Sequence, residues 1–388
     1  MKIDVFAMVI YMIVPIMVFS CKKNETGFDW DKYKPNDTTA NSSSIMDMQK
    51  VFSFSPQHRY AYCPSIIEDN NIQHVFFCGN PNENDFIDNI YHMTIDRQGN
   101  TTIPKSVLQP TNITGFWDDR HTCDPSVVAG NFGYKGNTYS YAMFFLGNSK
   151  KYYYNEIGVA FSNSLNADSW VKFDTVFIKK PWSTPGDQQV GTSKSWGIGQ
   201  PDAITLNPEN GDILLTYTRG DNEGSRLVYR LIKGMKNVET LEMGPEIVVN
   251  SNGVNKYKTN SPDYLRNAVL ALDKTKNQFV MIRPMSPFAT SYPAFIASYL
   301  EVTTISTDGF YKNTGKWNSI AQISPSDTKY PRNHNAGLVR DKYGSMIGST
   351  DSTEIYFTTC LEEPAVENAF GKFAEWTYTI WRAKLKPH

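Results

Sequence analysis

The chain has 388 residues, of which 40% are apolar and 13% aromatic, and its 38 basic and 39 acidic residues give a formal net charge of −1. This length is sufficient for one large hydrophobic core or two smaller ones. Lys and Arg do not cluster in the body of the chain. Nucleic acid is therefore not an expected partner, because neutralising phosphates requires a concentrated basic surface.

The N-terminus has the layout of a signal peptide. Lys2 precedes an apolar run over residues 5–19, and Cys21 follows two residues after the run ends. The alternative is a membrane-spanning helix, but the run is shorter than the roughly 20 residues that a span requires, and Pro15 interrupts it. We therefore predict a signal peptide over residues 1–20.

Residues 17–21, Met-Val-Phe-Ser-Cys, resemble the lipobox of bacterial lipoproteins. The resemblance implies that the thiol of Cys21 carries the lipid and that the membrane is a partner through this lipid. Residues 21–50 are rich in Asn, Asp, Ser and Thr and cannot bury a core, so we expect a flexible spacer or a low-complexity tail. The expected location is the cell envelope, either in the periplasm or on the outer membrane at the cell surface.

Four cysteines remain in the predicted body at residues 51–388: Cys63, Cys78, Cys123 and Cys360. An oxidising compartment permits two disulfides among them, with three possible connectivities. No pair has the C-x-x-C spacing of a zinc site. We therefore predict no metal and no cofactor.

The body contains many short apolar runs separated by Gly, Asn and Asp, which indicates an all-β fold. Five segments share one form, a polar residue followed by an apolar strand, and they begin at Cys63, Asp124, Asp202, Asn267 and Asn335. Each is followed by a turn and a second apolar strand, at residues 74–78, 141–146, 212–217, 278–282 and 345–347.

This repeat predicts a five-bladed β-propeller, because the distance between successive starts is long enough for four strands and radial packing buries both faces of each blade. A β-sandwich, or a pair of them, is the alternative, but it would not require five recurrences. In a propeller the first strand of each blade lines the central funnel. The five starting residues should therefore converge at the funnel. We expect the protein to be a monomer.

The repeat resembles the five-bladed propellers of glycoside hydrolase family 43 and its invertase-like relatives. The similar segments are residues 124–128, Asp-Pro-Ser-Val-Val, and residues 156–162, Glu-Ile-Gly-Val-Ala-Phe-Ser, with Trp170 after them. The resemblance covers most of residues 55–385.

In family 43 a base Asp lies on the first blade, an orienting Asp on the third and an acid Glu on the fourth. Asp202 matches the third position, whereas Cys63 and Asn267 depart from the other two. In the invertase-like relatives Asp124 matches an Asp of the second blade. Cys63 again departs from the first-blade nucleophile, and Asp202 is shorter than the expected Glu.

Glycoside hydrolysis requires one carboxyl group to protonate the leaving oxygen and another to activate water or attack the sugar. Asp124 and Asp202 are the acids at the predicted funnel starts, so we expect Asp202 to act as the acid and Asp124 as the base. The alternative is that both are turn-forming residues that cap backbone amides.

Aromatic and polar residues stand close to the predicted funnel starts and would form a sugar platform, with rings for stacking and polar groups for hydroxyls. The candidates are Trp117, His121, Trp196, Arg266, Asn267, His334 and Asn335. His334 resembles the funnel His of family 43, which in many members helps to hold a metal, but a structural histidine is the simpler interpretation.

These features favour a glycoside hydrolase that acts on an oligosaccharide or polysaccharide outside the cytoplasm. The main alternative is a glycan-binding propeller without catalysis, which Cys63 and Asn267 favour. A scaffold within an outer-membrane assembly is a third. A sialidase ranks lower, because the segments nearest to an Asp-box, residues 162–170 and 306–317, have the wrong spacing.

Overall fold

The computed structural model describes residues 43–54, 59–82, 86–150, 154–181, 196–221, 224–255, 265–288, 296–348, 350, 353–362, 367–368, 371–372 and 374–386. The predicted signal peptide and Cys21 lie outside this part of the chain. Strands dominate the described ranges, which confirms the all-β prediction. None of the helices in these ranges has the length and apolar character to cross a membrane.

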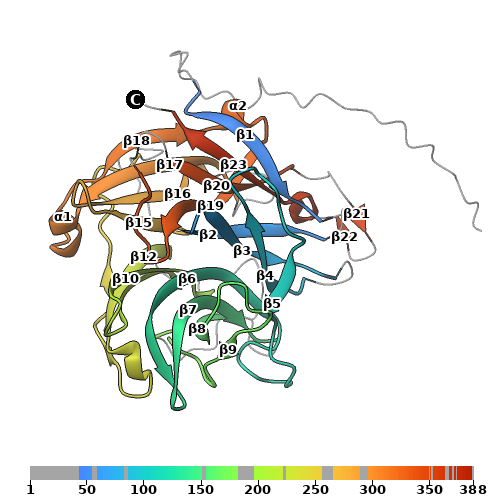
Figure 1. The fold of residues 1–388 in the computed structure, drawn as a ribbon. Helices are drawn as coiled ribbons and strands as arrows, with labels where there is room; N and C mark the ends of the chain where they lie inside the picture. The colour runs from blue at the N-terminus through green and yellow to red at the C-terminus, as the bar shows by residue number, and fades with distance from the viewer. Residues whose placement is uncertain are drawn as a thin grey trace, which may run out of the picture.

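The strands pair antiparallel in five consecutive groups, which are the blades of a β-propeller (Figure 1). Blade one contains β2 (Ala61–Asp69), β3 (Ile72–Gly79), β4 (Asn89–Ile95) and β5 (Lys105–Leu108). Blade two contains β6 (His121–Tyr134), β7 (Asn137–Asn148), β8 (Asn155–Ser162) and β9 (Val171–Lys172). Blade three contains β10 (Gly197–Asn207), β11 (Asp212–Asp221), β12 (Gly224–Lys233), β13 (Glu242–Met243) and β14 (Ile247–Val248).

Blade four contains β15 (Val269–Asp273), β16 (Gln278–Phe288), β17 (Ala297–Ser306) and β18 (Asn318–Ile323). Blade five contains β19 (Arg332–Asp341), β20 (Glu354–Cys360), β23 (Thr379–Leu385) and β1 (Ile45–Phe52). The short remaining elements are helices α1 (Thr307–Tyr311) and α2 (Pro325–Thr328), 3₁₀ helices η2 (Met235–Asn237) and η4 (Ala374–Thr377), and the hairpin of β21 (Glu367–Asn368) and β22 (Gly371–Lys372).

The blades close into a ring in which the innermost strands β2, β6, β10, β15 and β19 each contact the next, and β19 contacts β2. The closing strand is β1, which supplies the outermost strand of blade five and pairs with β23 near the other end of the chain (Figure 1). β1 begins at Ile45, within the segment assigned to the spacer. The propeller therefore starts before residue 51.

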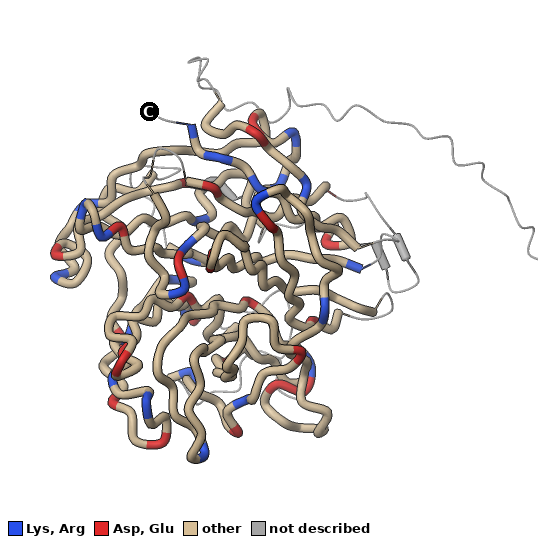
Figure 2. The backbone as a smooth tube through the Cα atoms, in the orientation of Figure 1, with Lys and Arg blue, Asp and Glu red and all other residues tan. Residues whose placement is uncertain are grey.

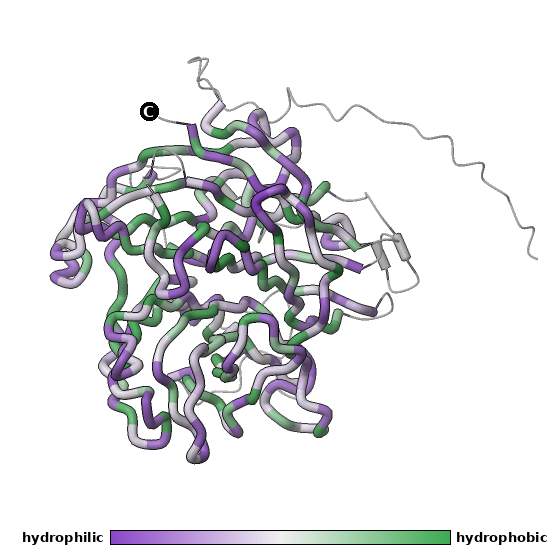
Figure 3. Tube along the Cα trace, in the orientation of Figure 1, coloured by the Kyte–Doolittle hydropathy of each residue, from purple (hydrophilic) through white to green (hydrophobic). Residues whose placement is uncertain are grey.

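The hydrophobic core is divided among the seams between blades. Separate clusters of buried side chains join blades one and two, two and three, three and four, four and five, and five and one. Figure 3 shows hydrophobic residues recurring within the strands, whereas many peripheral turns are hydrophilic. This division is expected for a propeller, because each sheet is covered on both faces by its neighbours.

Two details of the predicted repeat need correction. Residues 345–347, predicted as the second strand of the fifth repeat, instead make isolated bridges to Leu272 and Arg340. The second strand of blade five is β20. The third repeat begins at Gln200 rather than at Asp202. Gln200 has a φ of 54° and lies at a β-bulge, as do Cys63 and Asp124, with φ values of 55° and 48°.

The closing strand provides a test of the fold. Ile45 is 4% exposed in the seam between blades four and five, so Ile45→Ala should lower the free energy of unfolding by about 2–5 kcal/mol through lost burial and an unfilled cavity. Met46, the next residue, is 37% exposed, and Met46→Ala should change stability by less than about 0.5 kcal/mol. Urea unfolding followed by tryptophan fluorescence measures both. Equal effects would contradict the burial of β1 in the propeller.

Candidate functional site

The funnel mouth is formed by one residue from each blade. These five residues, which we call the mouth ring, are Cys63, Asp124, Gln200, Asn267 and Asn335. All have positive φ, between 43° and 55°, a backbone conformation that is uncommon for residues other than glycine and is retained where the surrounding structure enforces it. Four of the five, all but Asn335, line one cavity at the ring, with a volume of about 20 Å³, which is room for about one water molecule.

A repeated hydrogen bond fixes the ring to the neighbouring blade. The Cys63 N–H donates to Thr358 Oγ1 at 3.3 Å, and the Asn267 N–H donates to Thr218 Oγ1 at 2.8 Å. At the same position the Asp124 N–H donates to Cys78 Sγ at 2.8 Å. In each case the acceptor lies on the second strand of the preceding blade. The strained backbone is thus held by contacts across the seams.

Asp124 is the carboxylate of the ring. Its side chain is 6% exposed, and burial raises its pKa from 3.8 to about 6, against the opposing effect of the Cys63 thiol as a hydrogen-bond donor. The negative charge of Asp88 raises the pKa further, whereas the backbone N–H of Gln200 lowers it. Near neutral pH Asp124 can therefore both lose and regain a proton.

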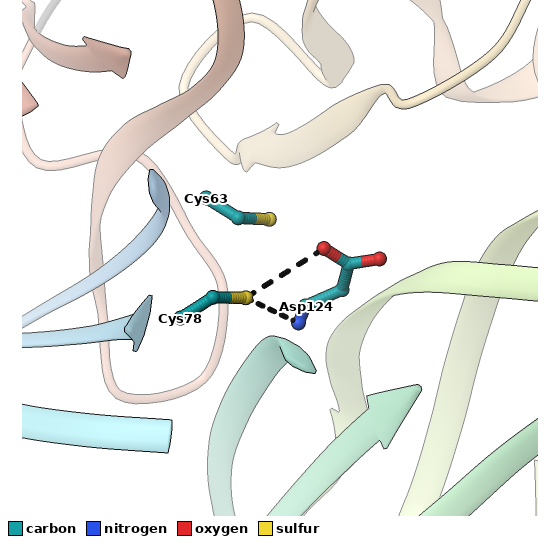
Figure 4. A group of neighbouring side chains, drawn as sticks. All are labelled: Cys63, Cys78 and Asp124. Carbon is teal, nitrogen blue, oxygen red and sulfur yellow. Dashed lines mark hydrogen bonds between the residues drawn. The ribbon is translucent and has the colours of Figure 1, made fainter. Parts of the chain in front are cut away.

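Cysteine pairing differs from the expectation of two disulfides. Cys78 of β3 and Cys123 of β6 form one disulfide between blades one and two, and Cys63 and Cys360 are free thiols. Figure 4 shows the Cys63 thiol and Cys78 Sγ close to Asp124. Burial, and then the charge of Asp124, raise the pKa of the Cys63 thiol well above its ordinary value.

Asp202 lies two residues beyond the ring and also lines its cavity, but its carboxylate is already paired. Its Oδ1 forms an ion pair with Arg340 at 2.8 Å and accepts a hydrogen bond from Ser126 Oγ at 3.2 Å, and its Oδ2 accepts from the Leu270 N–H at 2.7 Å. Ser126 occupies the same place one blade earlier, where its Oγ accepts from the Ala203 N–H at 2.9 Å. We therefore assign Asp202 a role in holding the inner strands together.

A second carboxyl group, that of Asp88, lies near Asp124 and was not among the residues expected from the sequence. Asp88 precedes β4 and is 5% exposed. Its Oδ2 accepts a hydrogen bond from the Tyr62 hydroxyl at 3.2 Å, and its N–H donates to His121 Nδ1 at 3.1 Å. His121 thus positions the loop of Asp88. The sequence carries no sign of this pairing, because Asp88 lies in an irregular loop outside the repeat.

Both predicted tryptophans lie half-buried at the mouth end of their blades. Trp117 covers Gly147 and Gly158, where an added Cβ would lie 2.0 and 2.5 Å from the ring. Trp196 covers Gly220, where an added Cβ would lie 2.0 Å from its indole nitrogen, and it donates to Ser225 Oγ at 3.0 Å. The glycines allow each indole to lie flat against the backbone.

The remaining predicted residues gather on blades four and five. The side-chain amide of Asn267 donates to Asn335 Oδ1 and lies 3.4 Å from His334 Nε2. His334 is buried, and its Nδ1 has no hydrogen-bond partner among the residues that the structure describes. Burial, together with the charge of Arg266, lowers its pKa to about 3. His334 is therefore neutral at ordinary pH.

His334 is also the residue that resembles a metal-holding histidine. Within the described ranges, the side chains close enough together to share a metal ion are Cys63, Cys78 and Asp124, and His334 is not among them. Cys78 is bound in the disulfide and cannot act as a thiolate ligand. This donor set does not fit the metal ion that many family 43 members hold. The proposed reaction therefore includes no metal ion.

No protein-family model matches the chain, and no curated protein matches its sequence. Solved structures do match its fold. A family 117 glycoside hydrolase, Zg3597 from the marine bacterium Zobellia galactanivorans, has a TM-score of 0.53 at 12% identity, covering 88% of this chain and 91% of that one. The α-L-arabinofuranosidase PaAbf62A from Podospora anserina has a TM-score of 0.54 at 11% identity, covering 89% and 96%.

A third match is the family 43 enzyme GH43_1 from Xanthomonas citri, with a TM-score of 0.52 at 10% identity, covering 88% of this chain and 90% of that one. The fold is therefore that of the five-bladed propeller glycoside hydrolases of families 117, 62 and 43. The resemblance stated from the sequence is confirmed for the fold.

The role assigned to Asp202 predicts a loss of stability. Asp202→Asn leaves the Arg340 guanidinium, 1% exposed, without its counter-charge and should lower the free energy of unfolding by about 3–5 kcal/mol. The exposed pair of Asp168 with Lys105 is the control, where Asp168→Asn should change stability by less than about 1 kcal/mol. Urea unfolding at pH 7 measures both. A variant Asp202→Asn as stable as the wild type would contradict this role.

The buried Asp124 predicts a pH dependence. Because its folded-state pKa is raised, from 3.8 to about 6, its contribution to stability is complete below about pH 4 and is lost as pH rises through about 6. Between about pH 4 and pH 7 the wild type should therefore lose on the order of 3 kcal/mol relative to Asp124→Asn. Urea unfolding across this range gives the difference. Parallel curves for the two proteins would contradict the raised pKa.

Proposed function

We propose that this protein is a glycoside hydrolase that cleaves a glycosidic bond at the mouth ring, with Asp124 as the group that transfers the proton. The observation that carries the proposal is Asp124 itself. It is a buried carboxyl group with a pKa of about 6, at the funnel mouth of a fold whose solved members include glycoside hydrolases. A raised carboxyl pKa suits a general acid that must be protonated near neutral pH.

The two carboxyl groups near the mouth, those of Asp88 and Asp124, have different roles in the proposed reaction. Asp88 lies near enough for its charge to raise the pKa of Asp124, so it favours the protonated acid that gives its proton to the leaving oxygen. This differs from the expectation from the sequence, in which Asp202 was the acid and Asp124 the base. The cavity at the ring, about 20 Å³, is too small for a sugar ring. We infer that the glycan lies above it, where the half-exposed faces of Trp117 and Trp196 are available for stacking.

The substrate class follows from the neighbours as a proposal. Three of the matched structures are named as α-L-arabinofuranosidases, from Podospora anserina, Coprinopsis cinerea and Lactobacillus brevis, so arabinofuranosides are the first substrates to test. Because of the N-terminal sequence, we propose that the reaction takes place outside the cytoplasm and that a lipid on Cys21 holds the protein at the cell envelope. We also propose that it acts as a monomer. Lys and Arg are interspersed with Asp and Glu along the chain (Figure 2), and we propose no nucleic-acid partner.

A glycan-binding propeller without catalysis is the second candidate. The mouth ring holds a thiol or an amide at Cys63, Gln200, Asn267 and Asn335, so Asp124 is its only carboxylate. Asp202 is committed to Arg340. A site that has lost its second ring carboxylate could retain the tryptophans and bind a sugar without cleaving it.

The experiment uses aryl arabinofuranosides and arabinose-containing, plant and host polysaccharides as substrates. Asp124→Asn should lower kcat/KM by about 10²–10⁴-fold, because proton transfer is lost, while glycan affinity measured by calorimetry stays within about threefold. Asp308→Asn, on exposed helix α1 and paired with Lys312, is the matched control and should leave both quantities unchanged.

The outcomes separate the two candidates. Turnover that depends on Asp124 supports the hydrolase. If the wild type turns over no substrate and glycan affinity falls in Trp196→Ala, the results support the binding protein instead. Turnover that survives Asp124→Asn would remove Asp124 from the chemistry.

A further inference from the structure

A free thiol lies beside a disulfide at the funnel mouth. Cys63 Sγ, Cys78 Sγ and a carboxylate oxygen of Asp124 all lie within 4.8 Å of one another. Cys123 is not part of this group, although it is bonded to Cys78. The Cys63 thiol is therefore closer to Cys78 than to Cys123, and Figure 4 shows it beside Cys78 Sγ and Asp124.

This arrangement suits thiol–disulfide exchange, in which a thiolate attacks one sulfur and the other sulfur leaves. Attack on Cys78 makes Cys123 the leaving group. The strands also bring the new pair together, because Cys63 follows Tyr62, which is paired with Cys78 between β2 and β3. A bond from Cys63 to Cys78 would join adjacent strands of blade one.

Asp124 is placed to move the proton. Its carboxylate lies within 4.8 Å of Cys63 Sγ, close enough for the thiol to lower the carboxyl pKa as a donor. Its Oδ1 also lies 3.4 Å from Cys123 Sγ and 3.8 Å from Cys78 Sγ. One carboxylate therefore contacts both the thiol that must lose a proton and the sulfur that must gain one.

We propose that Cys63, Cys78, Cys123 and Asp124 form a thiol–disulfide exchange centre that moves the disulfide between two positions. The Cys63 proton passes to Asp124, and Cys63 Sγ bonds to Cys78 Sγ. The electron pair of the Cys78–Cys123 bond leaves on Cys123 Sγ, which takes the proton from Asp124. One disulfide and one thiol are present before and after, so no external oxidant or reductant is required.

The exchange changes what holds the mouth together. The bond between Cys78 and Cys123 joins blade one to blade two, whereas a bond between Cys63 and Cys78 lies within blade one and frees a thiol at Cys123. The seam beside Asp124 would lose its covalent link. This inference does not require the proposed hydrolase activity, although both use Asp124 to transfer a proton, and the labelling of Cys123 reports on the exchange alone.

The raised pKa of the Cys63 thiol makes unassisted exchange slow at neutral pH, since the thiolate is the attacking species. With Asp124 as proton acceptor, the rate should rise through about pH 6 and then level off. Without it, the rate should rise about tenfold per pH unit up to the thiol pKa. The shape of the pH profile therefore reports on the relay.

The test labels the full chain with N-ethylmaleimide between pH 5 and pH 9, over a range of reagent concentrations, and then maps its peptides by mass spectrometry without reduction. We expect two species, one with Cys63 labelled and the other with Cys123 labelled and Cys63 bonded to Cys78. The ratio of the two labels, as a function of reagent concentration, gives the population and the exchange rate.

Variants assign the parts. Cys63→Ser should abolish labelling of Cys123, and Asp124→Asn should slow exchange at pH 7 by at least about tenfold and give the log-linear pH profile. Cys360→Ser removes the second free thiol of the residues that the structure describes and should leave the labelling of Cys63 and Cys123 unchanged. An intact bond between Cys78 and Cys123 in all wild-type molecules, or labelling of Cys123 in Cys63→Ser, overturns the exchange. Equal rates and profiles in Asp124→Asn overturn the relay.

Discussion

The buried ion pair of Asp202 and Arg340 is the interaction on which the centre of this propeller depends. It joins the inner strands of blades three and five, and the same carboxylate accepts hydrogen bonds from Ser126 of blade two and Leu270 of blade four. Arg340 also donates to the Leu270 carbonyl at 2.6 Å. Burying both charges carries a large desolvation cost, which their mutual attraction and these hydrogen bonds offset. Four of the five blades contribute to these interactions.

The mouth ring depends on this centre. A positive φ at five residues that are not glycine is strained. It is maintained because the inner strands below the ring are fixed and three of the five ring amides are bonded across the seams. Asp124 is buried as a consequence. Its pKa follows from that burial rather than from any one partner, and both the proposed hydrolysis and the proposed exchange use the resulting proton-transfer group.

Much of the fold could be predicted from the sequence, because each blade repeats a short strand pattern that only radial packing satisfies. The third predicted start, Asp202, lies two residues beyond Gln200, the residue with the positive φ. The dipeptide Gln200-Pro201, which parallels Cys63-Pro64 and Asp124-Pro125, was the available signal. Strand β1 and the disulfide were not predictable in this way, because both join segments far apart in the sequence. The position of Asp88 in the site was not predictable either, because Asp88 lies far from Asp124 in the sequence.

Asp202 is assigned a structural role as the partner of Arg340. A double-mutant cycle with Asp202→Asn and Arg340→Met, measured by urea unfolding at pH 7, tests it most directly. The two residues contact each other at 2.8 Å, so the double variant should be destabilised far less than the sum of the single variants, with a coupling energy of at least about 2 kcal/mol. Additive effects would contradict the account and return Asp202 to the candidates for catalysis.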